Sequence, residues 1–112
     1  MNNNLKFGQF ISEKRIKLSM ESQELAKALG ISNAYLSQLE KGIRTHPSAE
    51  LLDKMAKILC LNKAETEIMY DLYAEVSGQI SPDIAEYVAE NKIVRQALRA
   101  ARDADAADYS IL

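Results

Sequence analysis

The stretch that decides the fold runs from Ser22 to Lys41 and reads SQELAKALGISNAYLSQLEK. Its apolar residues recur at intervals of three and four on both sides of Gly30, which predicts two short helices over about 22–29 and 33–40. Gly30 suits the left-handed conformation that ends a helix, and Ser32 suits the N-cap of the next one. The sequence therefore predicts two helices joined by a tight turn.

The rest of the chain also predicts helices, because prolines and glycines are few and no segment shows a sustained alternation of period two. These helices are expected over about 5–17, 49–59, 63–77, 82–90 and 92–104. Ser48 is expected to cap the helix from 49, and Asn62 with Glu65 fits a capping box for the helix from 63. An apolar stripe of that helix is expected to consist of Ile68, Leu72 and Val76, with Met69 and Tyr73 beside them.

Charge is distributed unevenly along the chain. The net charge is −2, but residues 1–61 contain nine Lys or Arg and six Asp or Glu, which gives +3. Residues 62–112 contain five Lys or Arg and ten Asp or Glu, which gives −5. A basic segment can approach phosphate groups, whereas an acidic segment is repelled by them. The asymmetry predicts different partners for the two parts.

Composition excludes several classes of protein. Cys60 is the only cysteine and His46 the only histidine, so neither an internal disulfide nor a metal site is expected. No apolar run approaches the roughly 20 residues that cross a bilayer, and the N-terminus lacks the features of a signal peptide. No catalytic set or glycine-rich phosphate loop occurs, so neither an enzyme nor a cofactor is expected. These features indicate a cytoplasmic protein in which Cys60 is a small buried residue.

The outward face of the second helix of the pair is uncharged before Glu40. With Leu36 and Leu39 turned inward, the outward residues are Asn33, Ala34, Tyr35, Ser37 and Gln38. Asn and Gln can form two hydrogen bonds with adenine in the major groove of DNA, and an Ala methyl can meet a thymine methyl. This face is therefore predicted to contact base edges.

With these features, residues 7–59 resemble the Cro/cI-type (XRE) helix-turn-helix family of phage repressors and bacterial regulators. The matching residues are Ile11, Arg15, Leu25, Ala26, Leu29, Gly30, Ser32, Leu36, Ser37, Leu39, Glu40, Gly42, Pro47, Leu52, Ala56 and Leu59. The resemblance covers about half of the chain. It implies an all-α fold, with a five-helix lambda-repressor-like helix-turn-helix domain followed by C-terminal helices. We expect the helix-turn-helix domain in residues 1–61 and a helical extension for dimerisation or partner binding in residues 62–112.

The resemblance also implies roles for individual residues. Base contacts are expected from Asn33, Ala34, Tyr35, Ser37 and Gln38. Phosphate contacts are expected from Ser22, Gln23, Lys41, Arg44, His46 and Ser48. The structural residues are expected to be Arg15, Glu40, Ala26, Gly30, Leu36 and Leu39. In the family, the arginine of this set pairs with the glutamate, and the pair braces the recognition helix.

Some positions leave alternatives open. Family members commonly begin the first helix of the motif with Ser-Gln, where this chain has Glu21-Ser22, so Gln23 is expected to replace the usual phosphate contact. Tyr35 can pack on the domain as partial core, and His46 can be structural. A basic stripe of the last helix can be a second nucleic-acid surface, or a solvated face that pairs with acidic helices. The stripe consists of Lys92, Arg95, Arg99 and Arg102.

Two functions follow as hypotheses. The first is a sequence-specific transcriptional repressor that binds double-stranded operator DNA as a homodimer, with helix 33–40 in the major groove. The second is the antitoxin of a toxin–antitoxin pair, which binds a partner protein through the acidic residues 62–112 and regulates its own promoter. A domain that has lost DNA binding is disfavoured, because Lys41, Arg44 and the polar face of helix 33–40 are retained.

Overall fold

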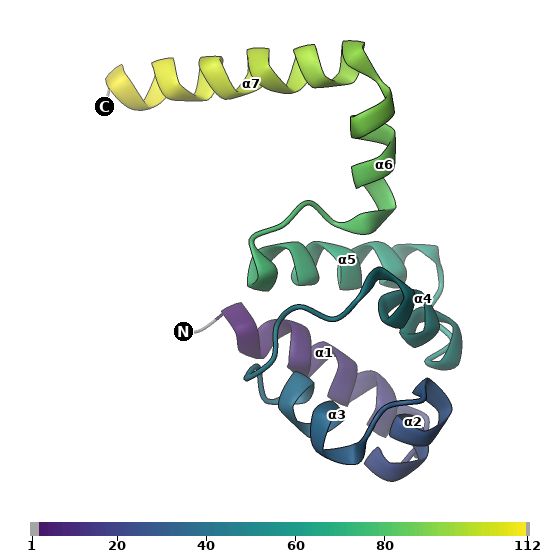
Figure 1. The fold of residues 1–112 in the computed structure, drawn as a ribbon. Coiled ribbons are helices and arrows are strands. Elements are labelled where there is room, and N and C mark those ends of the chain that lie inside the picture. The colour runs from purple at the N-terminus through teal and green to yellow at the C-terminus, as the bar shows by residue number, and fades with distance from the viewer. Residues whose placement is uncertain (1–2, 112) are drawn as a thin grey trace. The chain divides into compact units, whose positions relative to one another are not determined.

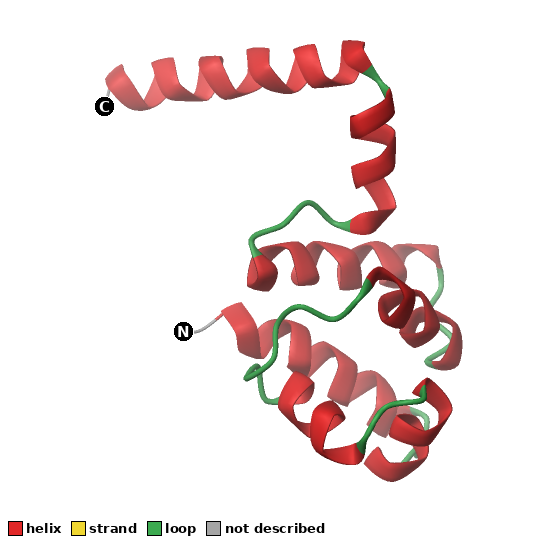
Figure 2. Cartoon of the chain, in the orientation of Figure 1, coloured by secondary structure: helices red, strands yellow, loops and turns green. Residues whose placement is uncertain are grey.

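The computed structural model describes the backbone of residues 3–111 and the side chains of residues 6–105. This part of the chain forms helices connected by turns and loops and contains no strand, which confirms the all-α prediction (Figure 1 and Figure 2). The helices are α1 (Asn3–Lys17), α2 (Ser22–Leu29), α3 (Asn33–Glu40), α4 (Ala49–Ile58), α5 (Lys63–Ser77), α6 (Pro82–Glu90) and α7 (Lys92–Ile111). They divide into two compact units, Met1–Ser81 and Pro82–Leu112.

The local signals in the sequence set most helix boundaries. Gly30 lies in the left-handed region with φ 74° and ends α2, and the hydroxyl of Ser32 accepts a hydrogen bond from Tyr35 N at the start of α3. The hydroxyl of Ser48 caps α4 in the same way, by accepting from Leu51 N at 3.1 Å. Asn62 forms the predicted capping box at the start of α5. These caps confirm the sequence prediction, since each satisfies backbone groups that the helix leaves free.

The core of the first unit lies between α1 and the four helices that follow it in Figure 1. Its fully buried large side chains are Phe7, Ile11, Leu25, Leu29, Leu36, Leu39, Leu52, Met55 and Met69. Every helix from α1 to α5 contributes at least one of them. The burial of so many apolar side chains supplies the main favourable free energy of this unit.

The unit that contains the motif extends further than the sequence predicted. The division was expected after residue 61, but the first compact unit continues through α5 to Ser81. The reason is that α5 packs along α1, where Phe7 and Tyr73 meet edge to face with ring centroids 6.3 Å apart. Lys14 Nζ and Glu65 Oε2 form an ion pair between the same two helices, at 2.6 Å. Helix α5 therefore completes the core of the first unit.

The buried face of α5 agrees only in part with the predicted one. Met69, Tyr70 and Tyr73 are buried. Leu72 and Val76 are partly buried against the core, whereas Ile68 is 48% exposed. The two faces are neighbours on the helix, one residue apart in sequence, so the apolar period alone did not separate them. Contact with Phe7 of α1 selects the side that carries Tyr73.

The second unit consists of α6 and α7. Asn91 caps α7 by accepting a hydrogen bond from Val94 N at 3.1 Å. The guanidinium of Arg95 donates to the carbonyls of Val88 and Ala89, at the end of α6. Helix α7 continues to Ile111, beyond the predicted end near residue 104, since no glycine or proline interrupts it. None of the side chains described in residues 82–105 is buried.

Candidate nucleic-acid interface

The candidate interface is built on α3, which is held from its inner side. Leu36 and Leu39 are fully buried in the core, and Ala26 of α2 is buried next to the turn that precedes α3. The left-handed Gly30 closes that turn with its N–H donating to Lys27 O at 3.1 Å. Two helices fixed in this way present one face of α3 outward as a rigid surface.

The outward face of α3 carries the residues that sequence analysis assigned to base contacts. Asn33 and Ala34 are exposed, while Tyr35, Ser37 and Gln38 are half-buried. No charged side chain lies in α3 before Glu40. The face therefore offers amide and hydroxyl groups and a methyl group, which are the groups that read base edges in the major groove.

Helix α1 braces the end of α3 through one ion pair. Arg15 Nε lies 2.9 Å from Glu40 Oε2, and Arg15 Nη2 lies 3.1 Å from Glu40 Oε1. Arg15 Nη1 also donates to Met20 O at 3.0 Å. The two side chains are only 14% and 12% exposed. The hydrogen bonds to Glu40 raise the pKa of Arg15 above its ordinary value, so the guanidinium stays charged at every physiological pH.

A glycine that the sequence analysis did not single out lets α1 approach α3. Gly8 is buried in α1, and a Cβ atom at this position would meet Glu40 O and lie 2.6 Å from Leu39 O. Real Cβ atoms do not approach a backbone oxygen so closely, so only glycine fits here. The signal in the sequence was a glycine inside an otherwise regular helix.

The residues assigned to phosphate contacts lie on three segments of the first unit. Ser22 and Gln23 begin α2, Lys41 and Arg44 follow α3, and His46 and Ser48 precede α4. All of these side chains are exposed except Ser22, which is half-buried.

The start of α2 carries two carboxylates. Glu21 occupies the N-cap position, and its backbone N–H donates to Glu24 Oε1 at 3.0 Å. Negative charge at a helix N-terminus stabilises the helix, but it also repels a phosphate that approaches the same end. Of the two residues assigned here, the exposed Gln23 is the better placed for a phosphate contact.

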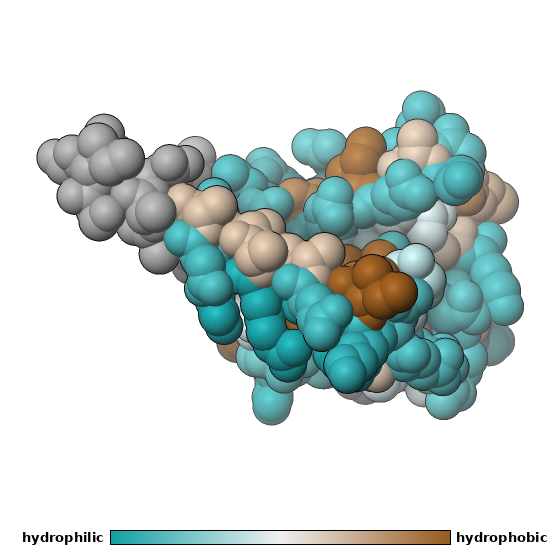
Figure 3. Space-filling view, turned by 90° about the horizontal axis from the view of Figure 1, so that it is seen from above, coloured by the Kyte–Doolittle hydropathy of each residue, from teal (hydrophilic) through white to brown (hydrophobic). Residues whose placement is uncertain are grey.

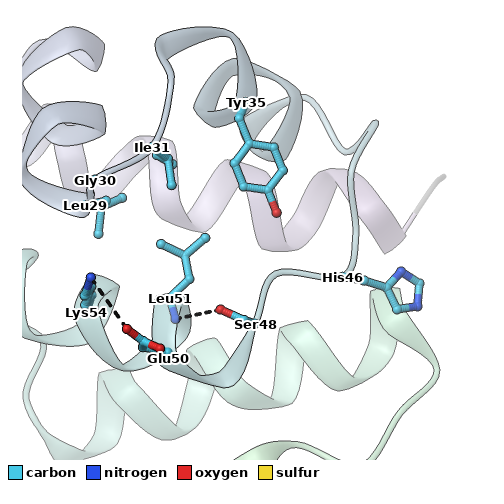
Figure 4. Close-up of a pocket in the computed structure, with 9 residues that line it drawn as sticks. All are labelled: Leu29, Gly30, Ile31, Tyr35, His46, Ser48, Glu50, Leu51 and Lys54. Carbon is cyan, nitrogen blue, oxygen red and sulfur yellow. Dashed lines mark hydrogen bonds and ion pairs between the residues drawn. The ribbon is translucent and has the colours of Figure 1, made fainter.

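Tyr35 lines an open pocket beside α3. The pocket has a volume of about 440 Å³ and lies between the α2–α3 turn and the start of α4. Figure 4 shows the ring of Tyr35 projecting from α3 toward this end of α4, with His46 beyond it. Tyr35 also packs on the core cluster, so it occupies the partial-core position that was the alternative to base contact. The ring nitrogen Nδ1 of His46 is 3.0 Å from Thr45 Oγ1.

The structure also bears on the sequence interpretations of Cys60 and of the basic stripe of α7. Cys60 is exposed, and the prediction that it is buried was wrong. Helix α4 ends at Ile58, and Cys60 takes a left-handed conformation with φ 56° in the turn that follows. In the basic stripe of α7, Arg95 binds backbone carbonyls of α6 and Arg102 pairs with Asp103.

Among the described helices, none is both long and apolar enough to span a bilayer.

Comparison with known proteins identifies the same segment. The helix-turn-helix family matches residues 11–59. An uncharacterised HTH-type transcriptional regulator of Mycobacterium tuberculosis is 40% identical over 63 residues, which are 56% of this chain and 42% of that protein. The ImmF control region 10 kDa protein of Bacillus phage phi105 is 40% identical over 57 residues, covering 51% of this chain and 62% of that protein. The chain thus spans about two fifths of the mycobacterial relative.

The similarity to one relative extends beyond the helix-turn-helix motif. The HTH-type transcriptional regulator SinR of Bacillus licheniformis is 28% identical over 92 residues, covering 76% of this chain and 83% of that protein. A match of that length cannot lie within residues 1–61, so the similarity continues past α4. No solved structure matches the chain. The match to residues 11–59, the buried anchors of α3 and the left-handed turn agree, and together they support a helix-turn-helix domain of the Cro/cI (XRE) type in this segment.

Proposed function

We propose that this protein is a sequence-specific transcriptional repressor that binds operator DNA through α3. The helix-turn-helix match and the two relatives that are named HTH-type transcriptional regulators favour a DNA-binding transcriptional regulator over an enzyme. The observation that carries the proposal is the outward face of α3, where Asn33 and Gln38 present amides on a helix whose opposite face is locked into the core. An ordinary solvated helix carries lysines and glutamates on that face. The proposal places the protein in the cytoplasm, where it reaches DNA.

Phosphate contacts would orient α3 on the duplex. Lys41 and Arg44 are exposed directly after α3, and neither forms an ion pair with the residues that the structure describes. Cations without an acidic partner can neutralise phosphates and release counterions, which favours binding. The amide side chain of Gln23 would add a contact at the start of α2.

The proposed DNA-bound form is a homodimer. A single domain makes few phosphate contacts and binds weakly at physiological salt, whereas two copies read adjacent major grooves about 34 Å apart. The second unit supports this part of the proposal. Among its described residues, the large apolar side chains that are exposed are Ile84, Tyr87, Ile93 and Leu98. Two helices that bury none of their described side chains are too small to be stable alone, so a second copy would supply the missing core.

The space-filling view of Figure 3 shows apolar side chains at the surface among polar ones. The exposed apolar side chains of α6 and α7 that are named above could instead bind a different protein, as in the antitoxin hypothesis. The net charge of −5 in residues 62–112 would suit a basic partner. A short toxin-like reading frame next to the gene would favour this second function, and a stable homodimer in isolation would favour the first.

A gel-shift series on the DNA upstream of the gene tests whether side chains of α3 recognise the base sequence. Asn33→Ala and Gln38→Ala should each reduce the preference for operator over random DNA about fivefold or more, since one good base contact discriminates by that amount. Gln9→Ala, an exposed amide of α1, is the matched control and should leave the preference unchanged. If both α3 variants keep the wild-type preference, the assignment of α3 to base contacts is wrong.

A further inference from the structure

The loop that follows α3 is hydrogen-bonded to Gln38. Its backbone carbonyl accepts hydrogen bonds from Ile43 N at 2.9 Å and from Arg44 N at 3.2 Å. These bonds fold the loop back onto the end of α3. As a result, the side chain of Arg44 lies next to the side chain of Gln38.

The two side chains are joined by a hydrogen bond. Arg44 Nε donates to Gln38 Oε1 at 3.3 Å. Arginine carries only donors, so the carboxamide must turn its oxygen toward Arg44 and its NH2 group away from it. Among the described residues no carboxylate pairs with Arg44, so nothing competes with Gln38 for this guanidinium.

The orientation of the carboxamide decides which base Gln38 can read. A free Gln pairs with adenine by accepting from N6 and donating to N7. With Oε1 held by Arg44, Gln38 presents its NH2 group as the donor to a base. Guanine is the base that offers two acceptors, N7 and O6, on its major-groove edge. An amide that turns its NH2 group to the base therefore favours guanine over adenine.

We propose that Arg44 is a positioning residue that sets the base specificity of Gln38. It holds the Gln38 carboxamide with the NH2 group toward the DNA, so that the pair selects a guanine at one base-pair position in each half-site. This inference rests on the proposed function. It replaces the expectation that Arg44 serves only to contact phosphate.

The test is selection of bound sequences from a randomised DNA library by the full-length chain, followed by sequencing. The wild type is compared with Arg44→Met, Gln38→Ala and the double variant, and with Lys41→Met as a control that removes the same charge from an exposed neighbouring position. In the wild type, one position should prefer guanine. Arg44→Met should shift that position toward adenine about fivefold or more, because the freed carboxamide can then accept from N6.

The variants separate positioning from phosphate contact. Gln38→Ala should abolish the preference at the same position, and adding Arg44→Met to it should cause no further change there. Lys41→Met should weaken binding to all sequences equally. If Arg44→Met behaves as Lys41→Met does, the positioning role is wrong while the proposed function stands. If the wild type selects no sequence, both proposals fail.

Discussion

Arg15 holds both carboxylate oxygens of Glu40 and joins α1 to the last residue of α3. The pair is mostly shielded from water, and the third nitrogen of the guanidinium is satisfied by Met20 O. A charge pair of this kind is costly to break from one side, because the remaining charge loses its partner in a place that water reaches poorly.

Arg15→Met should lower the free energy of unfolding by about 3 kcal/mol, since it leaves the Glu40 carboxylate without its partner. Denaturant unfolding followed by circular dichroism measures this change. Lys57→Met is the matched control, because Lys57 pairs with Asp53 on the surface of α4 with most of its side chain exposed. The control should change stability by less than about 1 kcal/mol. Equal effects of the two substitutions would contradict the role assigned to Arg15.

Gly8→Ala should destabilise the protein although alanine is the better helix former. The added methyl meets the backbone oxygens of Leu39 and Glu40, which cannot move aside without shifting the end of α3. We expect a loss of about 1–3 kcal/mol in the free energy of unfolding, as for other overpacked sites. Gln9→Ala, one residue further along α1 and exposed, should stay within about 0.5 kcal/mol of the wild type. An unchanged or raised melting temperature for Gly8→Ala would show that α1 and α3 are not in close contact.

Helix boundaries could be predicted because their signals are local. Ser32, Ser48 and Asn62 cap their own helices, and Gly30 supplies its own left-handed turn. A cap depends on backbone groups within three residues, so the sequence around it contains the information. The outward face of α3 could also be predicted, because the positions of its two buried leucines, Leu36 and Leu39, fix the opposite face of the helix.

Contacts between distant segments could not be predicted in the same way. The inward face of α5 depends on where Phe7 of α1 lies, and the role of Gly8 depends on the distance between α1 and α3. The exposure of Cys60 depends on the direction of the chain after α4 has ended. The bond between Arg44 and Gln38 depends on how the loop folds back. The spacing of apolar residues along the sequence predicts none of these contacts.

Acid should weaken the attachment of α5 to α1. The hydrogen bond from Lys14, and then the one from the backbone N–H of Asn62, lower the pKa of Glu65 below its ordinary value, against the opposing effect of burial. The charged carboxylate thus contributes stability above its unfolded pKa, and this contribution is lost as the pH falls through the lower folded pKa.

Thermal unfolding of the wild type and of Glu65→Gln between pH 7 and pH 3 measures this contribution. The wild type should be the more stable at pH 7, and the difference between the two should shrink as the pH falls below the ordinary pKa of Glu65. Glu67→Gln, an exposed carboxylate on the same helix, should differ little from the wild type at any pH. A difference between Glu65→Gln and the wild type that does not change with pH would mean that Lys14 does not act on the charge of Glu65.

The second unit should hold two copies together. Replacing Ile84 and Leu98 by Asp places charges on the apolar surface of α6 and α7, where each side chain is 50% exposed. Light scattering should give a dimer for the wild type, twice the chain mass of 12.5 kDa, and a monomer for this double variant. Gln96→Asp adds a charge to an exposed polar position of α7 and should remain dimeric. A monomeric wild type would exclude the homodimer and leave residues 62–112 to a different partner.

Lys41 should contribute to DNA affinity through phosphate alone. Its side chain is exposed directly after α3, and no carboxylate pairs with it among the described residues. Removing one phosphate contact lowers the slope of log affinity against log salt by about 1 for each copy of the chain. Lys41→Ala should therefore lose affinity at low salt and approach the wild type as salt rises, with operator and random DNA affected alike.

Fluorescence anisotropy over a salt series, with both an operator duplex and a random duplex, measures this slope. Lys63→Ala at the start of α5 removes the same charge from an exposed position outside the α2–α3 motif and should keep the wild-type slope. A loss confined to the operator, with the slope unchanged, would instead assign Lys41 to the bases. Because Lys41 follows Glu40 directly, that result would mean that the end of α3 also enters the groove.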